Sequence, residues 1–589
     1  MKKIYSFIFA LAASVLALSS CVGSLDPEPY GLVDLDLMWT KYNYTKSYVN
    51  NLSNVNMNST YASTAAYCDE AQHVVDRTSG NYYKWIASDF NATNFMLSGD
   101  WDSHYNRIRS CTYYITNEYR INYDGLEDEE RTFWLVKAHF CRAWHYFELL
   151  RHYGKAVLYT EVFDTDATFT DVKLSGPEAV ADFIIADLDW CLSQAENEKS
   201  SYAYRWQLSN SDAGVLNRGF AWVLKARTAL YAASPYLYQE GSKYTWEYAY
   251  QINKDAMDIL LAHGYKLFDV EPTESYAYNC YDYYHVYPTG DISMSIDKET
   301  IFAGSSQLNM WQNNGLPTTK GQKTCGFCPT QELVDAYETT DGEPILDLEK
   351  PYLDDEHLQP NYNKNNKLYD PENPYANRDP RFYGSIFYNE SARFIAKPDS
   401  LVIYTYEGGN CGISEEANET YYTRTGYYMR KYHQTSSDED NKLDGHMNVA
   451  RLAEMYLNLA ECACEAGHLT EALDAVNMVR ERVNMPDIEE GISQDMLRLR
   501  IRNERRVELA YENFRFYDVR RWKIIDQTEE HVSGMKITKG SDGKYTYNRI
   551  AFDERIGKGQ DKYLLFPLSE TEVNKMLELT GDDWQNPGW

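Results

Sequence analysis

The sequence predicts a mainly α-helical fold in a single globule, with paired helices supporting a loop-rich face. Three observations lead to this prediction. Apolar residues recur at helical spacing over several long stretches that end at Gly or Pro. Two of these stretches are joined by a tight glycine turn. Residues 265–330 and 340–450 are instead rich in Tyr, Asn, Gly, Asp and Pro, a composition typical of turns and irregular structure.

The N-terminus predicts a lipoprotein signal. Two lysines precede an apolar run, residues 4–18, that is shorter than the roughly 20 residues needed to span a membrane. The run leads through Leu-Ser-Ser into Cys21, an order that resembles a lipobox. We therefore expect residues 1–20 to be a signal peptide, Cys21 to be acylated, and residues 21–38 to form a lipidated tail. The alternative is a plain secreted protein with a coincidental Cys.

Composition restricts the class of partner. The 589 residues carry 88 acidic and 57 basic side chains, a formal charge of −31, so nucleic acid is not expected as a partner. Disorder is not expected either, because 43% of residues are hydrophobic and 15% are aromatic. The 52 tyrosines combine an apolar ring with a polar tip, which suits half-wet surfaces and ligand platforms.

The first expected helices lie in the N-terminal half. Residues 131–153 carry apolar side chains at helical spacing, and Gly154 is the expected stop. The same pattern covers residues 218–238, broken near Pro235, and residues 246–263.

The clearest helix pair lies near the C-terminus. Residues 452–466 have a sharp apolar face, and Gly467 is expected to close that helix. Thr470 is expected to cap a second helix that ends before Pro486. Two such helices joined by a tight turn predict a tetratricopeptide-like hairpin, and a few of these are expected within a larger domain.

The cysteines predict no metal site. Apart from Cys21 there are ten, with one C-x-x-C, Cys325 and Cys328, and no second ligand pair nearby. We interpret them as structural, whether as disulfides or buried thiols. No cofactor is expected.

No motif predicts an enzyme. The chain has no H-E-x-x-H, no G-x-S-x-G and no Walker loop. Glycosidases need two carboxylates at a defined separation, and no local pattern selects a pair among 88.

One charged cluster needs an interpretation. Glu504 and Glu508 share a helix face with apolar residues, and Arg505 and Arg520 are close in sequence. The cluster could bind an anion or perform acid–base chemistry. We interpret it instead as a structural ion-pair network that fixes helix packing, because buried carboxylates need partners.

Several segments carry a family resemblance. In chain order they are residues 329–337, 377–382, 451–461, 503–510, 514–522, 563–569 and 585–589. Each resembles a segment of the SusD/RagB nutrient-binding lipoproteins of Bacteroidetes, and together with the lipobox they run in family order to the last residue.

The resemblance implies a fold and a role. It implies one SusD-like domain over residues 39–589, with an N-terminal part at about 39–240 and a C-terminal part at about 265–589, built on four tetratricopeptide-like helix pairs. Such a protein captures an oligo- or polysaccharide and delivers it to a SusC-like TonB-dependent transporter. It is lipid-anchored in the outer membrane and faces the cell exterior. The residues directly after Cys21 are not acidic, so the surface-export signal is weak. Alternatives are a scaffold or peptide-binding lid on the same type of transporter, and a surface glycoside hydrolase.

The resemblance also suggests where the glycan would bind, on stretches 39–101 and 275–315. Flat aromatic rings beside polar side chains are the usual platform for sugars. The resulting candidates are Trp85 and Trp311 as platforms, with Asn43, Asp69, Arg77 and Tyr283 as further contacts. The competing interpretation of each is ordinary packing.

Overall fold

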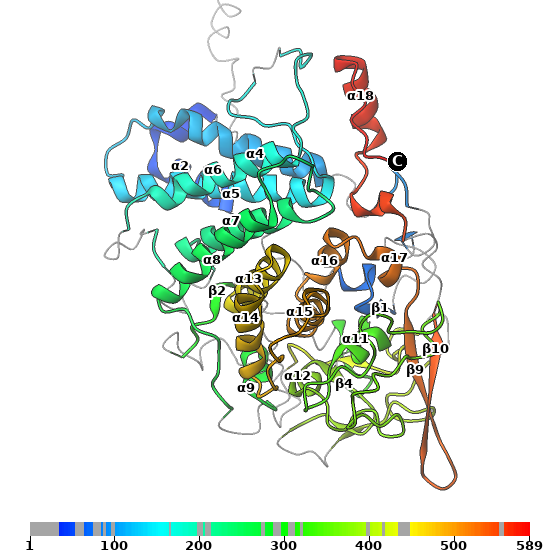
Figure 1. The fold of residues 1–589 in the computed structure, drawn as a ribbon. Helices are drawn as coiled ribbons and strands as arrows, with labels where there is room; N and C mark the ends of the chain where they lie inside the picture. The colour runs from blue at the N-terminus through cyan, green and yellow to red at the C-terminus, as the bar shows by residue number, and fades with distance from the viewer. Residues whose placement is uncertain are drawn as a thin grey trace, which may run out of the picture.

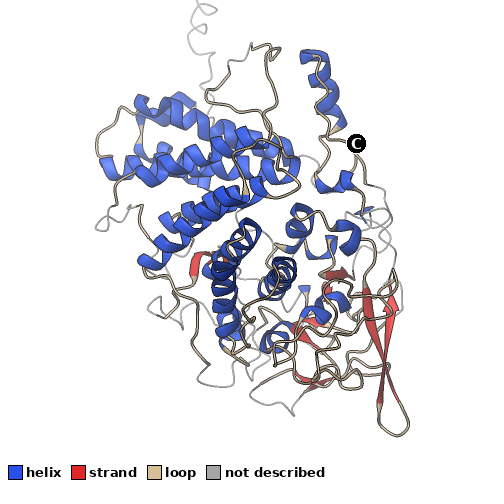
Figure 2. Ribbon diagram, viewed as in Figure 1, coloured by secondary structure: helices blue, strands red, loops and turns tan. Residues whose placement is uncertain are grey.

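Helices dominate the computed structural model, and the strands are few and short (Figures 1 and 2). The prediction of a mainly α-helical fold is confirmed. No helix in the described residues combines the length and hydrophobicity of a membrane crossing. The structure describes residues 35–53, 64–74, 84–85, 90–95, 100–163, 167–196, 204–206, 214–272, 277–286, 296–303, 313–318, 322–395, 401–414, 419–433, 448–552 and 559–589. Cys21, Arg77 and Trp311 lie outside these ranges.

The N-terminal half is a stack of long helices in which consecutive helices pack side by side (Figure 1). Glycine and polar caps set their ends. The largest helix stops at Gly154, whose φ of 69° is the left-handed conformation that glycine adopts readily. Asn217 caps the start of the helix over Arg218–Ala233, where its side chain accepts a hydrogen bond from the N–H of Phe220. The elements are η1 (Leu35–Thr40), α2 (Tyr42–Ser53), α4 (Asp100–Asn117), η3 (Glu118–Arg120), α5 (Asp128–Tyr153), α6 (Pro177–Ser193), α7 (Arg218–Ala233) and α8 (Trp246–Ala262).

The expected C-terminal hairpin is present as α13 (Leu452–Ala466) and α14 (Leu469–Glu481), with Gly467 at φ 89° between them. The prediction that Thr470 caps α14 was wrong. Residue His468 holds the capping position without a side-chain bond, so Thr470 lies within the first helical turn.

The helical stack continues with α13, which follows the loop-rich stretch in sequence. Helix α13 packs on α8, although the whole loop-rich stretch separates them in sequence. The pairing of strand β2 (Thr300–Ala303) with β8 (Asn448–Arg451) brings the chain back, because β8 runs directly into α13.

The remaining half holds short elements between long loops (Figure 2). All strands described lie in two-stranded antiparallel sheets, which pair β1 with β3, β2 with β8, β4 with β7, β5 with β6 and β9 with β10. The other strands are β1 (Ala71–His73), β3 (Phe327–Pro329), β4 (Ile386–Phe387), β5 (Ser391–Ala392), β6 (Val402–Ile403), β7 (Tyr428–Met429), β9 (Ser533–Lys539) and β10 (Tyr545–Ala551). The helices are η2 (Ala65–Tyr67), α9 (Cys280–Val286), α11 (Gln331–Ala336), α12 (Pro380–Ser385), α15 (Gln494–Glu508), α16 (Arg515–Arg521), α17 (Ile525–Thr528), η5 (Asp561–Leu564) and α18 (Glu570–Thr580).

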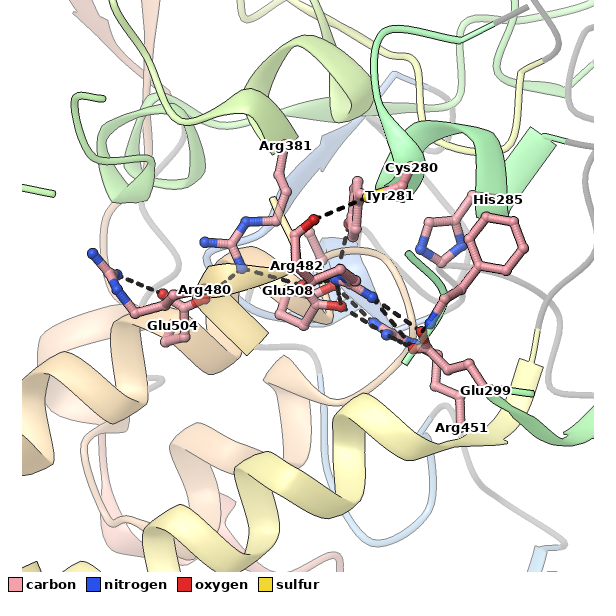
Figure 3. A network of polar contacts seen from close by, with 12 residues as sticks. Cys280, Tyr281, His285, Glu299, Arg381, Arg451, Arg480, Arg482, Glu504 and Glu508 are labelled. Carbon is pink, nitrogen blue, oxygen red and sulfur yellow. Dashed lines mark hydrogen bonds and ion pairs between the residues drawn. The ribbon is translucent and has the colours of Figure 1, made fainter. Parts of the chain in front are cut away.

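A buried ion-pair network joins α15 to the segments packed around it (Figure 3). The Glu508 carboxylate contacts Arg451 at 2.7 Å, Arg482 at 2.5 Å and Arg381 at 3.1 Å. Burial alone would raise the pKa of Glu508, but the three guanidinium groups outweigh it and lower that pKa well below its ordinary value. Glu504 pairs in the same way with Arg381 and Arg480.

The other two residues of the expected network are also buried and ion-paired. Arg505 contacts Asp518 at 2.7 Å, and Arg520 contacts Glu529 at 2.6 Å. These pairs tie α15 and α16 together and to the segment that follows. The structure therefore places these charged side chains in the interior, paired with one another between α15, α16 and their neighbours.

The ten described cysteines are all buried. The sulfur atoms of Cys325 and Cys328 are 3.6 Å apart, well beyond the roughly 2.05 Å of an S–S bond.

Candidate ligand-binding site

A cavity of about 450 Å³ lies between α4, α18 and the loop that follows α5. This volume is within the range of small-molecule pockets. We call the loop, whose described residues are 156–163 and 167–175, the aromatic loop. Figure 1 shows α18 and this loop at the same end of the helical stack. Aromatic side chains in the lining are Trp101, Tyr105, Tyr159, Phe163, Phe169 and Trp584.

Five rings form a continuous series from the interior to the surface. Trp101 and Tyr105 have centroids 4.9 Å apart, and Tyr105 meets Tyr159 edge-to-face at 5.6 Å. Tyr159 then meets Phe163 at 5.0 Å, and Phe163 meets Phe169 at 5.2 Å. Exposure rises along the series, because Trp101 is buried whereas Phe163 and Phe169 are 38% and 39% exposed. The cavity therefore has a continuous aromatic wall that reaches solvent.

Helix α4 supplies its part of this wall by simple spacing. Trp101 and Tyr105 lie four residues apart and so share one face of the helix. Asp102, Asn106 and Arg109 follow on the neighbouring exposed face and also line the cavity.

The aromatic loop is closed at its base. Ala156 and Ser175 exchange two backbone hydrogen bonds, of 3.1 and 2.8 Å. Inside this closure the Tyr105 hydroxyl accepts from the N–H of Val157 at 2.6 Å, and the Tyr146 hydroxyl accepts from the N–H of Tyr159 at 2.8 Å. Two tyrosines from the helical stack thus hold the start of the loop.

The backbone of Phe169 is strained, with a φ of 55° that a non-glycine residue rarely adopts. Such a conformation costs on the order of 1–3 kcal/mol and persists only where the surroundings enforce it. Here it accompanies the contact between the Phe169 and Phe163 rings.

Polar groups surround the rings. Glu161 comes from the aromatic loop, and Glu572 and Lys575 come from α18. Burial raises the pKa of the Tyr105 and Tyr159 phenols, so both stay protonated over the physiological range. The site can therefore offer apolar faces, the Tyr159 hydroxyl and both signs of charge, whereas the Tyr105 hydroxyl is already bonded to Val157.

The C-terminal tail positions α18 against this site. The Asn586 side chain donates to the carbonyls of Tyr153, at the end of α5, and Phe566. The Lys155 ammonium donates to the Gln585 carbonyl at 3.0 Å.

The expectation that Trp85 is a platform must be corrected. Its side chain is 0% exposed and packs against Phe90, Phe516 and Tyr563, with the Arg520 guanidinium over the ring. No face of the indole is open to a ligand. The sequence alone could not place this ring, because aromatic residues occur both in cores and at binding surfaces.

The expected role of Asp69 is corrected for a similar reason. The residue is buried, both carboxylate oxygens contact Arg515 at 2.8 Å, and Arg506 lies 2.9 Å away. It lines a second cavity of about 180 Å³, but its oxygens are engaged by guanidinium groups.

Two further candidates lie away from the aromatic pocket. Asn43 is exposed on α2, and Tyr283 is half-buried on α9 with its ring against Phe268. Neither lines the cavity. Arg77 and Trp311 lie outside the described residues, so their expected role remains a prediction.

The sequence did contain a signal for the aromatic loop. Residues 156–175 place Tyr159, Phe163 and Phe169 among Thr, Asp and Glu, an unusual density of large rings in a polar loop. Large rings in a polar surface loop are a signal for a ligand-binding surface. Glu572 and Trp584 carry no comparable signal, since only the tertiary fold brings α18 to this end.

Comparisons with known proteins agree on one family. A sequence model described as the SusD family matches residues 291–589. SusD-like protein P2 of Formosa agariphila is 26% identical over 447 residues, covering 73% of this chain and 72% of the relative.

Solved structures share the fold. A SusD-like protein of Bacteroides fragilis has a TM-score of 0.72 at 24% identity, covering 95% of this chain and 99% of that one. A second protein from Bacteroides fragilis, described as a SusD-like carbohydrate binding protein, has a TM-score of 0.65 at 20% identity, covering 91% and 98%.

Proposed function

Because this chain belongs to the SusD family, we propose that it is a carbohydrate-binding protein that captures an oligo- or polysaccharide in the aromatic pocket without cleaving it. The observation that carries the proposal is the series of five rings leading out of a cavity with a polar rim. One of the similar structures is itself described as carbohydrate binding.

The chemistry of the pocket suits a sugar. A pyranose ring has apolar C–H faces, which stack on flat aromatic rings, and hydroxyl edges, which need donors and acceptors. Phe163 and Phe169 offer exposed faces, while Asn106, Glu161 and Lys575 supply hydrogen-bonding groups at the rim. An exposed pair of rings also tolerates several linkages, which suits capture of a polymer at internal positions.

Affinity gel electrophoresis across a panel of polysaccharides tests this function. We expect at least one polysaccharide to retard the protein. Tyr159→Ala and Phe163→Ala should each weaken that interaction by at least about tenfold, since aromatic side chains that a bound ligand covers dominate such contacts. Tyr119→Ala is the matched control, because Tyr119 is 72% exposed and does not line the pocket.

The outcomes separate two failures. Retardation that is unchanged in both pocket variants would show that the glycan binds elsewhere. No retardation by any polysaccharide, or the release of new reducing ends on long incubation, would reject the proposed function itself.

We further propose that Cys21 carries a lipid anchor and that the protein delivers its glycan to a SusC-like TonB-dependent transporter in the outer membrane. The Leu-Ser-Ser-Cys order and the family support this role. Incorporation of labelled palmitate, lost in Cys21→Ala, tests the anchor. Co-purification of the transporter from detergent-solubilised outer membranes tests the partnership. If the transporter co-purifies but no polysaccharide binds, the protein is a scaffold or peptide-binding lid instead.

A further inference from the structure

A cluster of imidazole and carboxylate groups lies beside the aromatic pocket, at the start of α4. His104 Nε2 is 3.2 Å from one carboxylate oxygen of Asp100, and His152 Nδ1 is 3.0 Å from the other. One ligand atom from each of the three residues lies within 4.8 Å of the other two. The histidines are largely buried, and Asp100 is half-buried, which leaves a path from solvent.

The opposite ring nitrogens are already occupied. His152 Nε2 is 2.9 Å from the Tyr517 hydroxyl, and His104 Nδ1 is 2.8 Å from His145 Nδ1. These contacts fix the ring orientation and leave His152 Nδ1 and His104 Nε2 directed at Asp100. Histidines that bind metals are held in this way, with the non-ligating nitrogen in a hydrogen bond.

Hydrogen bonds within the cluster do not account for the position of every ring nitrogen. His104 Nε2 is buried and close to Asp100, but it is not aligned for a hydrogen bond with any described residue. With its proton on Nδ1, which the contact with His145 allows, His104 would keep a lone pair on Nε2 for a metal. In tetrahedral zinc sites with metal–ligand distances near 2.0–2.1 Å, neighbouring ligand atoms lie about 3.3 Å apart. The two nitrogen–oxygen separations here, 3.2 and 3.0 Å, are close to that value, but they end on different oxygens of Asp100, so the carboxylate would bind through both oxygens or turn to present one.

We propose that Asp100, His104 and His152 form a binding site for a divalent transition metal, zinc in the first place. Two imidazole nitrogens and one carboxylate oxygen are a donor set that suits zinc. The metal joins the first turn of α4 to the last turn of α5, and water completes its coordination. Trp101 and Tyr105 directly follow Asp100 and His104 in α4, so the metal also steadies the inner end of the aromatic wall.

Metal content of the tag-free mature protein tests the site directly and does not depend on glycan binding. The protein is stripped with EDTA, dialysed against micromolar zinc and analysed by mass spectrometry for metal per chain. We expect one zinc per chain and a higher melting temperature with zinc than without it. Cobalt at the same site should give the intense visible absorption of tetrahedral coordination.

Variants locate the metal. Asp100→Asn and His104→Gln should each lose at least about tenfold in zinc affinity, and Tyr517→Phe about tenfold through His152. The matched control is His139→Gln, because His139 lies on α5, pairs with Asp187 at 2.7 Å and has the same side-chain exposure as His104. It should retain the zinc.

The proposal is overturned if the unmodified protein holds no stoichiometric zinc, or if both ligand variants bind zinc as well as the control does. An octahedral cobalt spectrum in the unmodified protein would also overturn it. This last measurement needs no variant, so a variant that fails to fold leaves the test intact.

Discussion

The Tyr105 hydroxyl lies 2.6 Å from the backbone nitrogen of Val157 and accepts its hydrogen bond. The same hydroxyl is 3.3 Å from the Val157 carbonyl, to which it donates. One side chain of α4 therefore satisfies both backbone groups of a buried loop residue. The ring of Tyr105 meanwhile forms part of the aromatic wall, so wall and loop are positioned together.

Tyr105→Phe should loosen the aromatic loop while keeping the ring. Losing the hydroxyl leaves the Val157 N–H buried without its partner, which costs about 1–3 kcal/mol. We expect faster hydrogen exchange at the amides of Val157 and Tyr159, and weaker glycan binding. Tyr113→Phe is the control, since Tyr113 lies on the same helix with its ring against Trp39. Equal exchange in the two variants would contradict this account.

Glu508→Ala should destabilise the protein severely. It removes the carboxylate that faces Arg381, Arg451 and Arg482 and leaves their charges buried. Breaking a buried pair in this way costs about 3–5 kcal/mol in the free energy of unfolding, measurable by chemical denaturation.

The control for that variant is Glu465→Ala. Glu465 pairs with Arg498 on a more exposed part of the helical stack, where a salt bridge contributes about 0–1 kcal/mol. A similar loss of stability in the two variants would mean that burial does not decide the strength of these pairs.

Glu70 should make stability depend on pH. Burial raises its pKa from 4.5 to about 7, so folding favours the protonated acid. Its contribution to stability is complete below pH 4.5 and is lost as the pH rises through about 7. Glu70→Gln mimics the protonated form and should be more stable than the unmodified protein at pH 8, by on the order of 3 kcal/mol, and equal at pH 4.5.

Melting curves of the Glu70→Gln variant at a series of pH values measure this effect. Glu240→Gln, at an exposed position, should follow the unmodified protein throughout. A Glu70→Gln variant that is less stable at pH 8 would show that the charged form is the one the fold requires.

The thiols should be unreactive in the folded protein. All ten described cysteines are buried, and burial raises the pKa of the Cys141 thiol to about 12, which suppresses the reactive thiolate. We expect a thiol reagent to modify none of these ten before denaturant is added and all ten afterwards. Rapid labelling of any of them in the native protein would indicate local opening around that residue.

Local patterns made much of the helical stack predictable. The stops at Gly154 and Gly467 follow from helical spacing that ends at a glycine, and both residues adopt the left-handed conformation. The Thr470 cap failed because the turn after Gly467 is so short that the helix has already begun at Leu469.

For the candidate site, the sequence predicts the type of side chain but not which residues form it. Composition indicates aromatic rings beside polar groups, but it does not separate Trp85, which packs in the core, from Phe163, which reaches solvent. The distinction depends on contacts between segments distant in sequence, such as α4 with α18. No local pattern encodes those contacts.

The docking of α13 on α8 has a consequence for how the chain folds. Helices α4 to α8 can assemble from neighbouring segments as they emerge, whereas α8 receives its next partner only after the entire loop-rich stretch has followed. Contacts that close long loops are slow to form. Until α13 has formed, one flank of the early intermediate therefore stays open to solvent, and a chaperone that shields exposed apolar surface would be needed most between the emergence of Ala262 and that of Leu452.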